Sequence, residues 1–565
     1  MEGAQTMKTY SQSFMALMQS AQAFNARKMT ETGRTVKNSR VIKACLWFFT
    51  LWLAGSGLAA AQLPPTVISG PTNQVQPAGE MLSLAVTTGG GPVQSYQWFK
   101  DSRRLCGATN STFTATNAGM ADSGSYYVVL TNMGGMVISL PALVAVDNPK
   151  LVDWGENGSG QLGNGTTGET NRPITIIGDV VTGSAGSDHA LFLTSDGTLW
   201  AMGQNKYGQL GNNTRILTNR PAAIQSNVVA VAAGFDHSLF VKNDGSLWAM
   251  GENNYGQLGN GNSSGTSSNP KPINVASNVT AVAAGVYHSL YIKNDGTLWA
   301  MGYNYAGQLG DGVNTAYDPN PTPVSVASNV VAVAAGYLYS LFITSDGKLW
   351  TMGDNRYGQL GDGMADGTNL PTSVASNVLA VASGFDHSLF VTDDGTLWAM
   401  GRNSFGQLGD GTINDTNLPE SVASNVVAVA GGQYFSLFVK TDRTIWVMGD
   451  NRTGQLGNGT TTATNVPNIV PHVYSVANVF PADNALYSMV IGANQTAAAI
   501  TMPNGIPTLS FPGIPGKSYS VARSTNLLGY WSVIWTTNEP PLGIFQITDP
   551  VAPQPNAYYR LLANP

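Results

Sequence analysis

The chain has 565 residues, which at about 100–200 residues per domain predicts three or four domains. Charged residues make up only 11% of the sequence, where about 25% is usual, and 65 residues are glycine. This composition excludes a coiled coil, a charged disordered chain and a basic nucleic-acid-binding domain. It favours an all-β protein of many short strands joined by glycine turns.

The first 61 residues have the parts of a secretory signal. Arg40 and Lys43 precede the apolar run 45–53, and an Ala-x-Ala pattern follows at 59–61. A transmembrane helix requires about 20 apolar residues, so the alternative of a membrane anchor has less support. We expect an exported chain, secreted or at the cell surface, that is cleaved after Ala61 and keeps no stable membrane span. Met29 is an alternative start.

Removal of this segment changes the charge and the cysteine content. The remaining chain has 20 basic and 31 acidic side chains, a net charge of −11 compared with −6 for the whole sequence. Such an acidic chain binds a phosphate backbone poorly, so we expect no nucleic-acid partner. Cys106 is then the single cysteine, which excludes an intrachain disulfide and indicates a loop thiol without a particular histidine partner.

Residues 62–147 alternate apolar and polar side chains between short turns, which predicts a small β-sandwich. The segment 122–128, which contains Tyr126, resembles the corner motif of immunoglobulin-like domains, and Trp98 stands where those domains keep their core tryptophan. The resemblance implies a disulfide-free sandwich packed on Trp98, acting as a spacer or adhesive module. Valines stand at the two expected cysteine positions, Val86 and Val128.

The middle of the chain is a repeat. The tetrapeptide Gly-Gln-Leu-Gly recurs seven times at intervals of 48 or 51 residues, and periods of roughly 20–50 residues indicate solenoids, propellers or arrays. Each unit has a small apolar run, two runs joined through an Asp-Gly turn, and a Pro/Val-rich stretch. Four short strands per unit favour propeller blades. The tetrapeptides begin at Gly160, Gly208, Gly256, Gly307, Gly358, Gly406 and Gly454.

These units resemble the repeats of the regulator-of-chromosome-condensation family, whose pattern is roughly V-x-x-G-x-x-H-S-L, then D-G-x-x-W, then G-x-N-x-x-G-Q-L-G. The similarity covers about residues 151–492 and implies a seven-bladed β-propeller. The predicted organisation is an all-β chain with a leader and secretory signal (1–61), an immunoglobulin-like domain (62–147), a seven-bladed propeller (148–495) and a small C-terminal β domain (496–565).

Each repeat contains a histidine-containing run and a tryptophan-containing run, and counting these half-repeats predicts how the ring closes. The run around Trp154 has no histidine-containing run before it, and the run 486–490 has no tryptophan-containing run after it. We expect residues 151–155 to pair with residues 478–491, because closure hides the edges that an open array exposes. The tryptophans predicted to lie wedged between blades are Trp154, Trp200, Trp248, Trp299, Trp350, Trp398 and Trp446.

The histidine position of the repeat does not indicate a metal ring. Tyr339, Phe435 and Tyr487 occupy three of its seven positions, so the favoured interpretation is a packed histidine that bonds a neighbouring backbone group. The Asp-Gly loops lack the spacing of a calcium loop and are interpreted as turns. The repeated Gln and Asn are expected to bond loop backbone. We expect neither a metal nor a cofactor.

A binding site is expected where the repeats differ, on loops held by a rigid frame. The two residues before the histidine position vary and should emerge on one face. Aromatic anchors among sparse charges suit a protein-binding hot spot or stacking on sugars; the alternative is that they only cap the blade cores. The loops near Lys206, Arg356, Arg402 and Arg452 are predicted to form a solvated rim. The predicted binding-face residues are Asp188, Phe235, Asp236, Tyr287, Tyr337, Phe385, Asp386 and Tyr434.

Residues 496–565 lie outside the repeat, and their strand-like runs predict a small β-sandwich. The segment resembles terminal modules of large secreted bacterial proteins, which implies sorting or surface attachment; an accessory domain without activity is the alternative. The strand-like runs are 508–511, 518–522, 531–535, 544–547 and 558–562.

No G-x-S-x-G, H-E-x-x-H or phosphate-loop motif occurs, so the sequence does not indicate an enzyme. We expect an exported, monomeric, non-enzymatic protein whose propeller face binds another protein or a glycan. Similar propellers occur in an exported bacterial inhibitor that covers β-lactamase with one aromatic- and aspartate-bearing face. One alternative is a guanine-nucleotide exchange factor for a small GTPase, the role of the family's founding eukaryotic member. Another is a secreted lyase or hydrolase that uses the propeller face.

Overall fold

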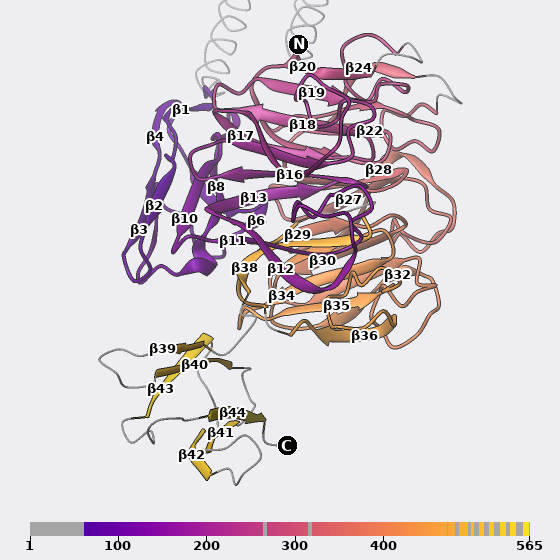
Figure 1. Ribbon diagram of the computed structural model, residues 1–565. Helices are drawn as coiled ribbons and strands as arrows, with labels where there is room; N and C mark the ends of the chain where they lie inside the picture. Colours follow the sequence, from indigo (N-terminus) through magenta and orange to yellow (C-terminus); the bar gives the residue numbers. More distant parts are fainter. Residues whose placement is uncertain are drawn as a thin grey trace, which may run out of the picture. The chain divides into compact units, whose positions relative to one another are not determined.

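The computed structural model describes residues 62–494, apart from 264–267, 315–318, 472 and 481–484, together with C-terminal strands between 499 and 563. The predicted secretory signal and its cleavage site lie outside the described residues. The described chain consists of β-strands and one short 3-10 turn, η1 (Met120–Asp122), and no helix in it is long and apolar enough to span a membrane. The predicted all-β fold class is confirmed (Figure 1).

The N-terminal strands form a small sandwich with an immunoglobulin-like core. The larger sheet has the order β2-β10-β8-β5-β6, with β9 paired to β8, and the pairs β3-β7 and β1-β4 complete it. Trp98 and Tyr126 are buried, and the Tyr126 hydroxyl donates to the carbonyl oxygen of Asp122 at 2.8 Å, as the corner motif implies. Val86 and Val128 lie in the same core. The strands are β1 (Pro65–Ser69), β2 (Gln74–Gln76), β3 (Leu82–Ala85), β4 (Thr87–Gly90), β5 (Ser95–Lys100), β6 (Arg103–Arg104), β7 (Thr112–Ala115), β8 (Gly124–Asn132), β9 (Gly135–Ile138) and β10 (Ala142–Val146).

Seven four-stranded antiparallel sheets follow, as the repeat predicts. Blades 1 to 6 are each continuous in sequence. Their strands are β13 (Val180–Ala185), β14 (His189–Thr194), β15 (Leu199–Gly203) and β16 (Thr218–Gln225) in blade 1; β17 (Val228–Ala233), β18 (His237–Lys242), β19 (Leu247–Gly251) and β20 (Asn269–Ala276) in blade 2; β21 (Val279–Ala284), β22 (His288–Lys293), β23 (Leu298–Gly302) and β24 (Asn320–Ala327) in blade 3; β25 (Val330–Ala335), β26 (Tyr339–Thr344), β27 (Leu349–Gly353) and β28 (Thr368–Ala375) in blade 4; β29 (Val378–Ser383), β30 (His387–Thr392), β31 (Leu397–Gly401) and β32 (Thr416–Ala423) in blade 5; and β33 (Val426–Gly431), β34 (Phe435–Lys440), β35 (Ile445–Gly449) and β36 (Thr464–Ile469) in blade 6.

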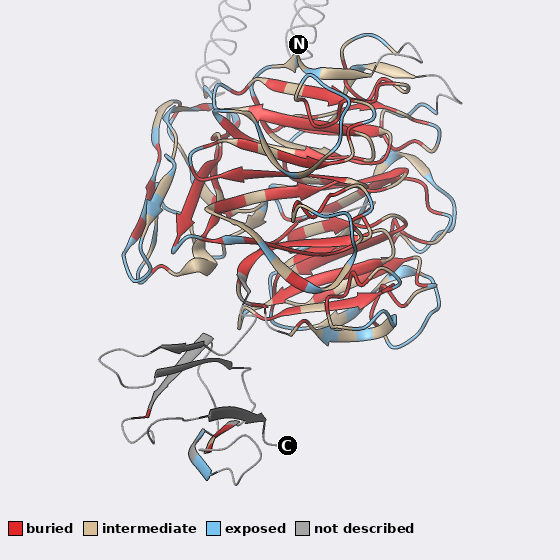
Figure 2. Ribbon diagram, in the orientation of Figure 1, coloured by how far each residue is buried: buried red, intermediate tan, exposed pale blue. Residues whose placement is uncertain are grey.

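The side chains explain the order of strands within a blade. First strands such as β17 consist of valine and alanine, which are small enough to converge around an axis, and residues of these strands line one central pocket. Second and third strands are almost fully buried, whereas the proline-containing fourth strand forms the outer edge, where its missing N–H is tolerated (Figure 2). The turn between the second and third strands of blade 2 requires Gly245, whose φ is +77°.

Blade 7 is assembled from both ends of the repeat region, which confirms the predicted closure. Its strand order is β12 (Thr170–Gly178), β11 (Lys150–Gly155), β38 (Tyr487–Asn494) and β37 (Val473–Val479). β11 pairs antiparallel with β38, with Lys150 opposite Gly492 and Gly155 opposite Tyr487. The first and last parts of the repeat therefore share one sheet and leave the ring without an open edge.

Trp154 differs from the expectation, because it does not occupy the tryptophan position of the repeat. It lies opposite Ser488, where blade 2 places Met250 opposite the equivalent serine. Val152 takes the tryptophan position. Trp154 is fully buried, and its indole N–H donates to the carbonyl oxygen of Gln455 at 2.8 Å.

The other six tryptophans are partly buried between blades. Trp248 of blade 2 packs against the core of blade 1, and Trp299 of blade 3 packs against the core of blade 2. Each is stacked nearly parallel to an aromatic ring on the neighbouring strand, as Phe240 is to Trp248 with ring centroids 6.2 Å apart. These six rings therefore join each blade to its predecessor.

The repeat histidines also join neighbouring blades. Nε2 of His189 lies 2.8 Å from Oγ of Ser238 in the next blade, and that hydroxyl donates to the carbonyl oxygen of Gln209. The partner is thus a serine side chain and not the backbone group that we expected. The same pairing joins His237 to Ser289, His288 to Ser340 and His387 to Ser436, each at 2.9 Å. Among the described residues, no group of His, Cys, Asp and Glu side chains could hold a metal ion.

The immunoglobulin-like domain packs on one end of the propeller strands. The Tyr127 hydroxyl donates to the carbonyl oxygen of Val331 at 2.8 Å, and the backbone N–H of Ile138 donates to Asn294 at 2.7 Å. Phe99 and Tyr127 share a hydrophobic cluster with blades 3 and 4. Because Asn294 lies in the turn between second and third strands, this docking defines a covered back end and an opposite front end of the propeller.

The C-terminal strands form two three-stranded antiparallel sheets, β39-β40-β43 and β42-β41-β44. Each of the five predicted runs overlaps a strand, and β39 is an additional one. The strands are β39 (Ala499–Thr501), β40 (Thr508–Gly513), β41 (Tyr519–Ser524), β42 (Ser532–Thr537), β43 (Gly543–Thr548) and β44 (Tyr558–Ala563).

Candidate binding face

Two loops of each blade meet at the front end. One connects the first strand to the second, and the other follows the third strand. They are adjacent because the second strand begins where the third ends, as His237 opposite Gly251 shows. The backbone N–H of Glu252 donates to the carbonyl oxygen of Asp236 at 2.8 Å and ties the two loops of blade 2 together.

The glycine before the variable pair is required by the buried ring three residues later, a histidine in four blades and Tyr339 or Phe435 in two others. A Cβ atom on Gly234 would lie 2.4 Å from Cε1 of His237, closer than packing allows. The close approach of ring and backbone holds the turn, and the two residues that follow, Phe235 and Asp236, are part-exposed at the front end. The repeat thus places variable side chains on fixed backbone positions.

The five predicted aromatic residues lie together in a row across blades 2 to 6. The rings of Tyr337 and Phe385 stack with centroids 4.2 Å apart and an interplanar angle of 12°. Phe235 lies 6.2 Å from Tyr287, Tyr287 lies 6.5 Å from Tyr337, and Phe385 lies 5.8 Å from Tyr434. All five are partly buried, so they pack on one another and on the blades while keeping exposed surface.

Four further aromatic residues that sequence reasoning missed extend this row. They lie in the second loop: Tyr255 is 4.9 Å from Tyr287 and 4.7 Å from Tyr303, and Phe405 is 5.0 Å from Tyr434. Tyr305, 49% exposed, stacks beside Tyr303. The available signal was their place in this loop, one, three or four residues after the glycine that ends the third strand. We call the nine residues the front arc: Phe235, Tyr255, Tyr287, Tyr303, Tyr305, Tyr337, Phe385, Phe405 and Tyr434.

Carboxylates near blades 1 and 2 have no basic partner. In the described chain no Lys or Arg forms an ion pair with Asp188, Asp236 or Glu252, and we call these three residues the acidic sector. Asp236 accepts a hydrogen bond from Nε2 of Gln209 at 2.8 Å. Burial raises the pKa of Asp236 to about 7, and the charges of Glu252 and Asp188 add to this effect, while the charge of Lys206 opposes it. Burial likewise raises the pKa values of Asp188 and Glu252.

Carboxylates of blades 4 to 6 are paired with arginines instead. Asp354 bonds Arg356 at 3.0 Å, Asp386 bonds Arg402 at 3.3 Å, and Asp450 bonds Arg452 at 2.9 Å. Burial raises the pKa of Asp386 to about 6 despite the opposing charge of Arg402. The front face is therefore polarised, with unpaired acid at one side and compensated charge at the other.

The arginine loops are not simply a solvated rim. Arg356 and Arg452 are exposed at 62% of their side-chain area, but Arg402 is 25% exposed, and its guanidinium lies over the rings of Tyr357 and Tyr434 at 4.9 and 5.1 Å. Arg452 lies over Phe405 at 4.8 Å. Cation–π contacts thus bind these arginines to the front arc.

Comparison with known proteins agrees with this architecture. The family model described as "RCC1-like domain" matches residues 57–388 and 277–499. Human WBSCR16 superposes with a TM-score of 0.55 at 22% identity, over 62% of this chain and 100% of that one. Yeast RCC1 (Prp20), in its structure with Kap60, superposes with a TM-score of 0.54 at 22% identity, over 62% of this chain and 90% of that one.

Curated relatives match shorter segments. A "Protein RCC2 homolog" of Danio rerio is 38% identical over 88 residues, which are 15% of this chain and 18% of the relative. An "X-linked retinitis pigmentosa GTPase regulator homolog" of Caenorhabditis elegans is 34% identical over 85 residues, 15% of this chain and 6% of the relative. The chain spans less than a fifth of the length of these relatives. With the family model matched across most of the chain and the propeller in place, the protein belongs to the RCC1-like family of β-propellers, which are protein-interaction scaffolds.

Proposed function

We propose that this protein is an exported, non-enzymatic binding protein whose front arc engages another protein. The observation that supports it is the row of nine contacting aromatic rings at the end of the propeller opposite the docked immunoglobulin-like domain. Large, packed aromatic side chains supply the hot spots of protein interfaces. Their mutual packing holds them in place before binding, which reduces the entropy lost on association.

The charge pattern supports a partner with basic side chains. Asp188, Asp236 and Glu252 of the acidic sector form no ion pair among the described residues, and the charge of Lys206 acts on two of them from a distance, so an incoming Lys or Arg would add the direct pairing they lack. Aromatic rings beside it provide faces for the same cations. A glycan is the alternative ligand for a row of aromatic rings. A neutral glycan has no positive charge to pair with these carboxylates, so the acidic sector favours it less.

Two other functions are less well supported. A role as a nucleotide exchange factor requires an intracellular chain, whereas residues 1–61 have the pattern of an export signal. Recovery of a cytosolic protein that retains residues 1–61 would revive that role. A lyase or hydrolase requires a paired acid and base or a metal near the front arc, and no group of described residues offers a metal site.

The test is a binding experiment with a matched surface control. The partner is identified by crosslinking from a photoreactive residue at Tyr305, then measured with purified components. Combined replacement of Phe235, Tyr287, Tyr337 and Phe385 by Ala should weaken binding at least a hundredfold. The control replaces Leu370 and Leu418, which are 57% and 55% exposed on the fourth strands, and should bind normally. Equal binding by the arc variant would reject the front arc, and binding only to glycans would favour the sugar alternative.

A further inference from the structure

A pocket along the propeller axis, which we call the chamber, is lined by the first strands and is reached from the back end by the immunoglobulin-like domain. The cavity is about 270 Å³ and is lined by valine and alanine of the first strands and by the tip of the β5–β6 hairpin. Asp101 and Ser102 at that tip have φ of 50° and 62°, a tight hairpin turn that carries Arg103 between the blades. β6 contacts β29, and Nζ of Lys100 bonds the carbonyl oxygen of Ala477, so the immunoglobulin-like domain reaches the chamber with this hairpin.

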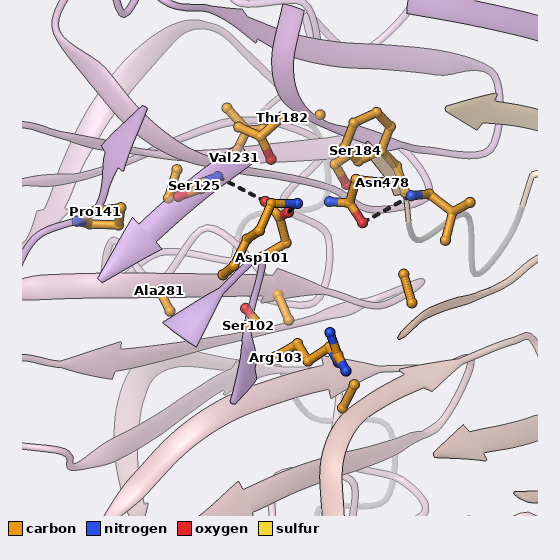
Figure 3. A pocket seen from close by; sticks show the side chains of 18 of the residues that line it. Asp101, Ser102, Arg103, Ser125, Pro141, Thr182, Ser184, Val231, Ala281 and Asn478 are labelled. Atoms are coloured by element: carbon orange, nitrogen blue, oxygen red, sulfur yellow. Dashed lines mark hydrogen bonds and ion pairs between the residues drawn. The ribbon is translucent and has the colours of Figure 1, made fainter. Parts of the chain in front are cut away.

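Arg103 enters this apolar chamber without a compensating acid. Figure 3 shows its side chain extending from the hairpin into the pocket. Its Nε is buried and has no hydrogen-bond partner. Burial lowers the pKa of the Arg103 guanidinium; Cys106 opposes this effect, and the nearby charge of Arg443, which also lines the pocket, adds to it. Two guanidinium groups therefore share a small cavity.

The carboxylate of Asp101, which also lines the pocket, does not serve Arg103. Its Oδ1 accepts the backbone N–H of Ser125 at 2.8 Å, and its Oδ2 pairs with Lys100 at 2.8 Å. Asp122, the other acid of the lining, accepts the backbone N–H of Gly119 at 2.9 Å. Both acids are thus committed within the immunoglobulin-like domain.

Neutral hydrogen-bond donors face the same space. Oδ1 of Asn478 accepts the N–H of Val479 at 2.9 Å, which leaves the amide nitrogen to donate, and Figure 3 shows that nitrogen turned toward the pocket. Ser184 accepts the N–H of Ala233 at 3.0 Å, which leaves its own hydroxyl hydrogen available. Arginine with amide and hydroxyl donors around one pocket is a donor set for an oxyanion.

We propose that this chamber binds a small oxyanion, a phosphate or a small carboxylate, held by Arg103 with Arg443, Asn478 and Ser184. Bound anion would satisfy the buried guanidinium and strengthen the joint between the immunoglobulin-like domain and the propeller, because Arg103 comes from one and Asn478 from the other. The chamber has room for several heavy atoms, since a water molecule occupies about 30 Å³ in the liquid.

The test is ligand-dependent stabilisation of the full chain. Inorganic phosphate, and in a separate arm succinate, is titrated against potassium chloride of equal ionic strength while the melting temperature and the calorimetric Kd are measured. A ligand that binds only the folded state raises the melting temperature with concentration. Arg103→Gln should weaken the Kd for the preferred anion at least tenfold. Arg104→Gln is the matched control, because Arg104 is the adjacent residue of the same strand and does not line the pocket.

The two arms separate phosphate from carboxylate as the ligand. If Arg103→Gln does not fold, Arg443→Gln tests the same chamber from the propeller side and should also weaken binding. Stabilisation no greater than that by chloride would overturn the proposal. So would equal effects of the Arg103 and Arg104 variants, which would indicate general screening of charge. These outcomes do not depend on the front arc, which lies at the other end of the propeller.

Discussion

The hydroxyl of Tyr487 in the last blade donates to the carbonyl oxygen of His189 in the first blade at 2.7 Å, and both residues are fully buried. This bond crosses the joint at which the ring closes. Elsewhere in this layer four blades have the histidine–serine pairs, and Tyr339 donates its hydroxyl to the carbonyl oxygen of Gly384 in the next blade at 3.0 Å. Phe435 cannot form such a bond. The closing joint is therefore held both by the β11–β38 pairing and by a bond between blades.

Removing the closing strand should cost more stability than its own contacts account for. Deletion of residues 148–158 takes away Leu151, Val152 and Trp154 and also exposes the edges of β12 and β38. We expect loss of more than about 5 kcal/mol and of cooperative unfolding, measured by urea denaturation. Tyr487→Phe, which removes one hydrogen bond, should cost only about 1 kcal/mol. An unchanged melting temperature after the deletion would contradict the closure.

Asp153 should destabilise the propeller at neutral pH. It is fully buried on β11, neither carboxylate oxygen has a hydrogen-bond partner, and burial raises its pKa well above the ordinary value. Because the unfolded chain releases this proton more readily, stability falls as pH rises above about 4. Asp153→Ala, which copies Ala249 of blade 2, should raise the free energy of unfolding by about 1–3 kcal/mol at pH 7. The gain should shrink toward pH 4; no gain at pH 7 would refute the account.

The buried histidines should make the propeller acid-sensitive. Burial lowers the pKa of His387 to about 3, as it does for His189, His237 and His288. The unfolded state then binds more protons between pH 6.5 and 3, so stability is full above pH 6.5 and is lost as pH falls, by about 1.4 kcal/mol per pH unit for each histidine. His387→Phe, which copies Phe435, should flatten this slope in denaturation at pH 5 and 7. An unaltered slope would contradict it.

Binding of a basic partner at the front face should strengthen as pH rises from 6 to 8. The pKa of Asp236 is raised to about 7 and that of Asp386 to about 6, so both carboxyl groups gain charge in this range. We expect a several-fold lower Kd at pH 8, and Asp236→Asn should remove most of that change while leaving the aromatic contacts. A Kd independent of pH in the wild-type protein would count against a basic partner at the acidic sector.

The propeller should depend on the immunoglobulin-like domain. Phe99 and Tyr127 are buried against blades 3 and 4, and Tyr127 bonds Val331. Residues 148–495 produced alone would expose this apolar surface, so we expect a lower melting temperature and association in sedimentation. Tyr127→Phe in the full chain keeps the packing and should lower stability by only about 1 kcal/mol. A monomeric isolated propeller of undiminished melting temperature would show that docking contributes nothing.

The repeat made much of the architecture predictable. Seven tetrapeptides at intervals of 48 or 51 residues determine the number of blades. The unpaired half-repeats determine the closure, because each strand has a definite neighbour. Trp154 does not take the tryptophan position because its spacing differs: it precedes its tetrapeptide by six residues, whereas Trp200 and the others precede theirs by eight. The strand register follows this spacing, so the buried Trp154 stands at the position that Met250 occupies in blade 2.

The sequence predicted the front-arc residues of the first loop and missed those of the second loop, and the difference has a physical reason. Phe235 and its equivalents directly follow the repeated glycine, which marks their position in the sequence. Tyr255 and Phe405 lie beside them only because the end of the third strand pairs with the start of the second, and this depends on the register of the sheet. Docking of the immunoglobulin-like domain was not predicted at all. Its trace in the sequence is that Phe99, Tyr127 and Val129, on the side of the sheet facing away from Trp98, are apolar as well.

The pairing of β11 with β38 has a mechanical consequence. Lys150 begins β11 and lies opposite Gly492 near the end of β38, so the chain enters and leaves the ring at the same end of two paired inner strands. Tension applied between the flanking segments would break the hydrogen-bonded residue pairs of β11 and β38 one after another, starting at Lys150 and Gly492. Resistance to such pulling would then fall first on the docked immunoglobulin-like domain, whose apolar contacts must shear before these pairs are reached.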